Sequence, residues 1–120
     1  MLAQMDMFEA APGLYCIPIP IPSPLAQVNC YLARGSHGWT VVDTGFHTPE
    51  AEGAWTRALR RLGITWKDIE RIVVTHYHPD HFGAAGWLQQ KTGAPVLMHA
   101  AEAATARWVW ATGSEGSVGF

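Results

Sequence analysis

The chain has 120 residues, of which 48% are hydrophobic and 15% charged, so it is long enough to bury an apolar core and is expected to form one domain over residues 1–120. Its formal net charge is -2 and its basic residues are scattered, apart from arginines at 57, 60 and 61, which argues against a nucleic-acid partner. The N-terminal segment has no basic stretch followed by an apolar run. We therefore expect neither a signal peptide nor a membrane span, and a cytoplasmic location.

The first part of the chain is rich in expected strands. After a polar lead, residues 13 to 17 (GLYCI) favour a short strand, and the alternating prolines of residues 18 to 24 remove backbone donors, which predicts a loop or an edge. Residues 27 to 34 and 39 to 43 are separated by GSHG and predict a hairpin. Cys16 and Cys30 fall on neighbouring expected strands. Without export signals we expect two buried thiols rather than a disulfide.

The second part of the chain alternates helices and strands. Thr48 as N-cap, Pro49 in the first turn and Gly63 as stop predict a helix, within which apolar residues recur at helical spacing. The same signals predict the later segments: a capped turn at 65 to 70, a buried strand at 71 to 74, a helix at 83 to 93, a strand at 95 to 98 and a helix at 100 to 113. Residues 114 to 120 lack periodicity and are expected to be disordered. This order predicts an α/β fold, a mixed sheet with flanking helices.

Residues 75 to 81, THYHPDH, concentrate three histidines and one aspartate. His76 and His78 directly follow a strand, and in an extended segment this spacing points both side chains the same way, toward one cation. Pro79 disfavours helical geometry at the residue before it and turns the chain, so Asp80 and His81 are expected on another side of the loop, where they can hold a second cation. Imidazole and carboxylate suit zinc, iron or manganese, which favours an open catalytic site. The competing interpretation is a solvated loop.

The segment THYHPDHFG resembles the H-x-H-x-D-H signature of the metallo-β-lactamase superfamily, and VNCYL at 28 to 32 and VVDTG at 41 to 45 match in the right order. The resemblance implies that His76 and His78 bind a first metal ion, that Asp80 and His81 bind a second, and that Asp43 lies close by and orders the site. Histidine rather than arginine at position 81 suits the group containing hydroxyacylglutathione hydrolases and lactonases, and disfavours a β-lactam substrate.

Members of this superfamily are αββα sandwiches about twice as long as this chain. The resemblance therefore implies an N-terminal half, with a third histidine, a bridging aspartate and a last histidine supplied by the later half. His47, after the DTG segment, and His99, after the strand at 95 to 98, are expected at the rim of the site. A homodimer that imitates the missing half is one expected form.

The resemblance predicts a metal-dependent hydrolase in which two zinc ions, or iron or manganese, activate water to attack a small-molecule ester, thioester or lactone. Asp80 would orient the nucleophile, and activity is expected if the missing half is supplied. One alternative is an iron-dependent oxidoreductase on the same fold, which metal identity would distinguish. Another is a non-catalytic metal-binding fragment, which would hold metal without turnover. A nuclease is disfavoured because no basic channel is visible.

Overall fold

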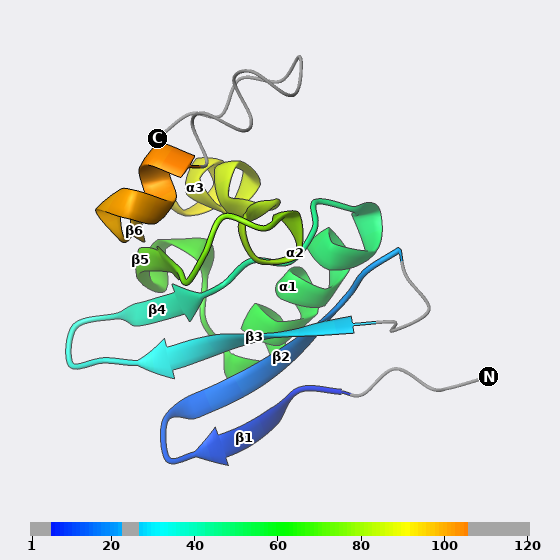
Figure 1. Ribbon diagram of the computed structural model, residues 1–120. Coiled ribbons are helices and arrows are strands. Elements are labelled where there is room, and N and C mark those ends of the chain that lie inside the picture. The colour runs from blue at the N-terminus through cyan, green and yellow to red at the C-terminus, as the bar shows by residue number, and fades with distance from the viewer. Residues whose placement is uncertain (1–5, 23–26, 106–120) are drawn as a thin grey trace.

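The computed structural model describes residues 6–22 and 27–105 of the chain (Figure 1). One six-stranded sheet runs in chain order from β1 to β6. Neighbouring strands are antiparallel from β1 to β4 and parallel from β4 to β6, so the expected mixed α/β sheet is confirmed. The strands are β1 (Phe8–Ala11), β2 (Leu14–Pro20), β3 (Gln27–Arg34), β4 (Trp39–Val42), β5 (Ile69–Val74) and β6 (Val96–Met98).

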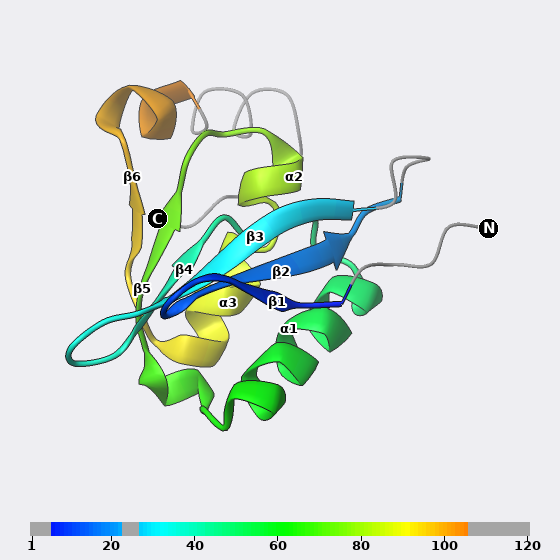
Figure 2. The same cartoon turned by 90° about the horizontal axis from the view of Figure 1, so that it is seen from below.

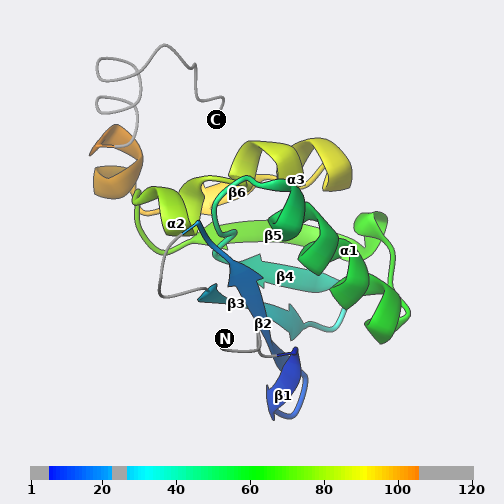
Figure 3. The same ribbon diagram turned by 90° about the vertical axis from the view of Figure 1, so that its right-hand side faces the viewer.

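Two helices cover one face of this sheet, as Figures 2 and 3 show from two sides. They are α1 (Pro49–Leu62) and α3 (Ala85–Thr92); a single turn, α2 (Pro79–Phe82), and a 3₁₀ turn, η1 (Trp66–Asp68), complete the elements. Leu32, Val41 and Ile72 are cross-strand neighbours at the centre of the covered face and are no more than 1% exposed. Trp55 of α1 is fully buried against them, so the apolar core lies between α1, α3 and the sheet.

The opposite face of the sheet carries an apolar row that crosses all six strands. Because directly paired residues point to the same face, the strand register aligns these side chains. The two ends of the row are large apolar side chains, 43% exposed at Phe8 and 46% at Leu97. The row consists of Phe8, Cys16, Tyr31, Val42, Val73 and Leu97.

Helix α1 forms where the sequence predicts it, and its ends show why. The Thr48 side chain accepts a hydrogen bond from the Ala51 backbone N–H at 3.0 Å, and Pro49 stands in the first turn. Gly63 ends the helix with a φ of 69°, a left-handed conformation that glycine adopts without strain. The capped turn is also confirmed, because Asp68 accepts from the Thr65 backbone N–H at 2.7 Å.

One expectation for the N-terminal part was wrong, and another was only partly right. The polar lead contains strand β1, and β2 continues through Pro18 to Pro20, where a loop or an edge was predicted. The prolines are tolerated because β1 pairs with β2 only as far as Cys16 in the described residues, so the second half of β2 has β3 as its neighbour on one side. This half of the strand therefore behaves as an edge although it is not a loop.

The C-terminal expectations are tested only in part. Residues 100–105 are helical, as predicted, whereas the rest of the helix predicted to residue 113 and the tail at 114–120 lie outside the described residues. Cys16 and Cys30 are free and buried, which confirms the expectation of two thiols. Within residues 6–22 and 27–105, no helix is both long and apolar enough to cross a membrane.

Candidate metal centre

The candidate site lies at the edge of the sheet where three parallel strands end. Asp43 follows β4, Thr75 follows β5 and His99 follows β6, and the register of these strands aligns their last residues. Loops at the carboxyl ends of parallel strands are where open α/β sheets commonly place their sites. The histidine-rich segment therefore starts beside the DTG segment, although Thr75 comes 32 positions after Asp43 in the sequence.

The Asp43 side chain makes several hydrogen bonds at this edge and is 8% exposed. One carboxylate oxygen accepts from the Thr75 backbone N–H at 2.8 Å, and the Thr75 hydroxyl lies 2.9 Å from both oxygens. His81 Nδ1 lies 2.9 Å from the other oxygen and must be the donor, because a carboxylate only accepts. The φ of Asp43 is 63°, a left-handed conformation that costs free energy in a non-glycine residue. Its contacts stabilise this conformation.

Three side chains of the predicted ligand set come together in the loop after β5. One donor atom from each of His76, Asp80 and His81 lies within 4.8 Å of the others. The ring centroids of His76 and His81 are 4.0 Å apart, and an Asp80 oxygen lies 3.4 Å from His81 Nε2. Pro79 was predicted to carry Asp80 and His81 to another side of the loop. Instead the turn of α2, which begins at Pro79, brings their donor atoms next to that of His76.

His78, the fourth predicted ligand, lies beside this group rather than in it. Its ring stands edge-on to that of His76, with centroids 4.9 Å apart and an interplanar angle of 87°. The two rings are therefore neighbours, as expected for histidines two positions apart after a strand.

The two histidines predicted at the rim have other contacts. His47 Nε2 lies 2.7 Å from a Glu52 oxygen, and its ring stacks on Trp87 at 5.9 Å. His99 accepts from the Ala101 backbone N–H at 3.1 Å and so begins the helical segment that follows β6. Neither residue joins the group that could hold a metal ion among the described residues.

The DTG segment also fixes the backbone of the histidine-rich loop. Thr44 is fully buried; its backbone N–H and its hydroxyl both donate to the His81 carbonyl, at 2.9 Å each, and the Ala84 N–H donates to the Gly45 carbonyl at 2.9 Å. Gly45 has a φ of 83°, and a Cβ there would lie 2.5 Å from a methyl carbon of Ile19. Only glycine satisfies both restrictions. The hydroxyls of Thr44 and Thr75 were missed from the sequence, although each directly adjoins a predicted site residue.

Cys30 lies near the site, but its thiol differs in chemistry from the imidazole and carboxylate groups of the predicted ligands. Burial raises the pKa of this thiol far above its usual range, and the nearby Asp43 and Asp80 carboxylates raise it further. Cys30 does not belong to the group of side chains that could hold a metal ion among the described residues. The donor set of the site is thus imidazole and carboxylate.

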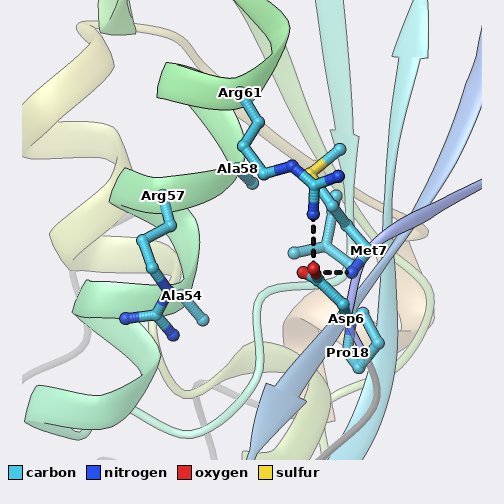
Figure 4. A pocket seen from close by; sticks show the side chains of 8 residues that line it. Asp6, Met7, Pro18, Ala54, Arg57, Ala58 and Arg61 are labelled. Atoms are coloured by element: carbon cyan, nitrogen blue, oxygen red, sulfur yellow. Dashed lines mark hydrogen bonds and ion pairs between the residues drawn. The ribbon is translucent and has the colours of Figure 1, made fainter.

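A cavity lies elsewhere, between α1 and the start of the sheet (Figure 4). Its volume is about 350 Å³, and Arg57, Arg61 and Asp6 line its polar side. Arg61 donates to Asp6 at 2.6 Å. The Met7 backbone N–H, followed by Arg61, lowers the pKa of Asp6 from its usual value. No member of the histidine group lines this cavity, so we place the chemistry at the strand ends.

The chemistry of the donor set fits a divalent transition-metal ion. Two imidazoles and a carboxylate are the ligands that zinc, iron and manganese share, and calcium and magnesium prefer oxygen alone. The buried Asp43 beside His81 is the kind of carboxylate that orients metal-binding histidines in proteins.

The family to which this fold and site belong is established by comparison. Residues 23–119 match the family model described as the metallo-β-lactamase superfamily, and the chain belongs to that superfamily. Among curated proteins, a probable metallo-hydrolase of Bacillus subtilis (strain 168) is 37% identical over 67 residues, 56% of this chain and 21% of the relative. A hydroxyacylglutathione hydrolase of Albidiferax ferrireducens is 39% identical over 84 residues, 70% of this chain and 29% of the relative.

Solved structures show the same relationship. A metallo-β-lactamase family protein of Thermus thermophilus is 39% identical with a TM-score of 0.78, over 88% of this chain and 35% of that one. A β-lactamase domain protein of Burkholderia ambifaria is 32% identical with a TM-score of 0.79, over 92% and 35%. The chain thus spans about a third of the length of these structures, and less of the curated relatives. The predicted fold, the N-terminal part of a metallo-β-lactamase-like sandwich, is confirmed.

Proposed function

We propose that this chain supplies part of the metal centre of a zinc-dependent hydrolase that acts on a small ester, thioester or lactone, with two zinc ions in the complete site. The observation that carries the proposal is the group of His76, Asp80 and His81, whose donor atoms lie within 4.8 Å of one another beside the buried Asp43. The hydrolase names of both curated relatives support it, and the hydroxyacylglutathione hydrolase favours a thioester among the substrates.

In this proposal the side chains of the loop divide into two pairs of metal ligands, and Asp80 also orients the water. His76 and His78 hold one ion, and Asp80 and His81 hold the other. Cations bound there would lower the pKa of a water molecule and polarise the substrate carbonyl. Asp80, whose side chain is 38% exposed, accepts a hydrogen bond from the attacking water and orients it toward the carbonyl carbon.

Metal content tests the proposal most simply. We expect elemental analysis of the untagged 120-residue chain, together with its solution mass, to find zinc in near-stoichiometric amount in preference to iron or manganese. His76→Ala should lose this zinc, whereas His99→Ala, a histidine at the same sheet edge but outside the group, should retain it. Zinc that survives His76→Ala, or wild-type protein that binds no metal, would contradict the ligand assignment.

Turnover tests the reaction separately. The zinc-loaded chain is assayed for hydrolysis of a glutathione thioester and of a lactone, with His76→Ala as the inactive control. Hydrolysis of either compound that depends on His76 supports the proposed reaction. Bound zinc with no turnover of either compound would favour a non-catalytic metal-binding role for this chain.

A further inference from the structure

The Thr75 hydroxyl stands between a buried carboxylate and a proposed metal ligand. Its Oγ1 atom lies 2.9 Å from both oxygens of Asp43 and 2.9 Å from Nδ1 of His76. The Thr75 backbone N–H donates to the same carboxylate at 2.8 Å, which fixes the position of the residue. Thr75 therefore connects Asp43 to a histidine that Asp43 does not itself contact in this hydrogen-bond network.

The direction of these hydrogen bonds follows from the number of protons. A threonine hydroxyl has one proton, and a carboxylate can only accept. If the hydroxyl proton pointed to His76, the Asp43 oxygens would face the lone pairs of Oγ1 at 2.9 Å. The favourable arrangement has the hydroxyl donating to Asp43 and accepting from the Nδ1–H of His76. This places the ring proton of His76 on Nδ1 and leaves the lone pair of Nε2 for a cation.

The same carboxylate acts directly on His81. His81 Nδ1 donates to Asp43 Oδ2 at 2.9 Å, so in the neutral ring the Nε2 atom, which lies 3.4 Å from Asp80, also presents a lone pair. In the proposed assignment His76 serves one metal ion and His81 serves the other. One buried carboxylate thus reaches a ligand of each ion, directly for His81 and through a hydroxyl for His76.

We propose that Thr75 is a positioning residue: its hydroxyl relays the hydrogen-bonding preference of Asp43 to His76 and holds that ring in the tautomer whose Nε2 can bind metal. That this tautomer serves metal binding rests on the proposed function. The tautomer itself is a property of the metal-free chain and can be measured there. Thr75 touches neither substrate nor metal in this account. Histidine ligands whose outer hydrogen bond is removed typically lose roughly 10- to 100-fold in metal affinity.

The test compares Thr75→Val, which keeps the shape and removes the hydroxyl, with Thr75→Ser, which keeps the hydroxyl. The readout is the pair of ring ¹⁵N chemical shifts of each histidine in the metal-free full chain, measured well above the ordinary histidine pKa of about 6.5, where the shifts distinguish the two neutral tautomers. We expect His76 to be the Nδ1–H tautomer in wild type and Thr75→Ser. In Thr75→Val it should become a mixture, while His81 stays unchanged. Asp43→Asn should perturb both rings.

Zinc affinity by competition with a chromophoric chelator provides the second readout. We expect Thr75→Val to bind zinc about tenfold or more weakly than wild type and Thr75→Ser to bind within about threefold of it. Amide spectra of each variant check that the fold is retained.

The outcomes separate the two proposals. A His76 ring that is Nε2–H in wild type, or that is unchanged in Thr75→Val, overturns the relay whether or not zinc binds. The expected tautomer change in a chain that binds no zinc supports the relay and contradicts the proposed function.

Discussion

Helix α1 and the loop after β5 are held in place by different kinds of contact. The helix is specified within its own sequence: Thr48 caps Ala51 three residues away, and Gly63 ends it. The loop is held by partners far away along the chain, since Asp43 and Thr44 bond to residues 32 to 40 positions later. A local sequence pattern is enough to form the helix. The loop takes its conformation only when the folded sheet brings it next to the DTG segment.

Burial, rather than separation in sequence, makes the long-range contacts of the loop strong. Asp6 and Arg61 are 55 residues apart and also form an ion pair, but their side chains are 80% and 54% exposed. Surface pairs of this kind contribute little because water competes for both partners. The bonds of Asp43 have no such competition, because its side chain is 8% exposed.

The largest effect should come from removing the buried acceptor of the loop. Asp43→Ala leaves the Thr75 and His81 donors without their partner and keeps a left-handed backbone conformation, so we expect a loss of about 3 to 5 kcal/mol in the free energy of unfolding. Denaturant unfolding measures it. Asp6→Ala, the exposed aspartate, is the matched control and should leave the unfolding midpoint unchanged. Equal effects for the two aspartates would contradict the distinction between buried and exposed pairs.

The next effect tests the backbone of the same loop. Gly45→Ala places a Cβ 2.5 Å from an Ile19 methyl carbon at a φ of 83°, so we expect a loss of about 3 kcal/mol. Gly86→Ala, in helix α3 with open space around its Cβ position, should instead gain about 0.5 to 1 kcal/mol. Thermal unfolding of both variants provides the comparison. A Gly45→Ala protein as stable as wild type would show that the loop is less tightly packed than described.

The smallest effect belongs to the helix. Thr48→Ala removes the side-chain acceptor of the Ala51 N–H, and we expect a loss of about 1 kcal/mol, with Thr48→Ser close to wild type. Because the cap is local, zinc affinity should not change in Thr48→Ala. A parallel loss of stability and of zinc binding would mean that the helix start and the metal loop are coupled.

The same contrast explains which parts of the molecule could be predicted from the sequence. Helix α1, the hairpin of β3 and β4, and strand β5 follow from caps, turn residues and apolar spacing. Strand β1 was missed because its residues, FEAA, are exposed throughout and carry no alternating pattern. The prolines of β2 were assigned to a loop or an edge because proline lacks a donor, and the sequence alone does not tell where the neighbouring strand stops.

The sequence indicated residues for the candidate site but not the contacts that connect them. The spacing of His76, Asp80 and His81 after a strand was visible, and so was an aspartate at the end of another strand. The relay through Thr75 was not visible, since a threonine before a histidine is common and its partner lies 32 residues earlier. Such contacts depend on sheet register, which sequence patterns specify poorly.

The central claim is that the loop after β5 binds metal beside Asp43, through His76 and His78 for one ion and through Asp80 and His81 for the other. X-ray absorption at the zinc edge of the zinc-loaded chain tests it most directly. The account predicts a shell of nitrogen and oxygen ligands with the outer-shell scattering of at least two imidazoles, reduced in His81→Ala. A shell of water oxygens alone, or one containing sulfur from Cys16 or Cys30, would contradict it.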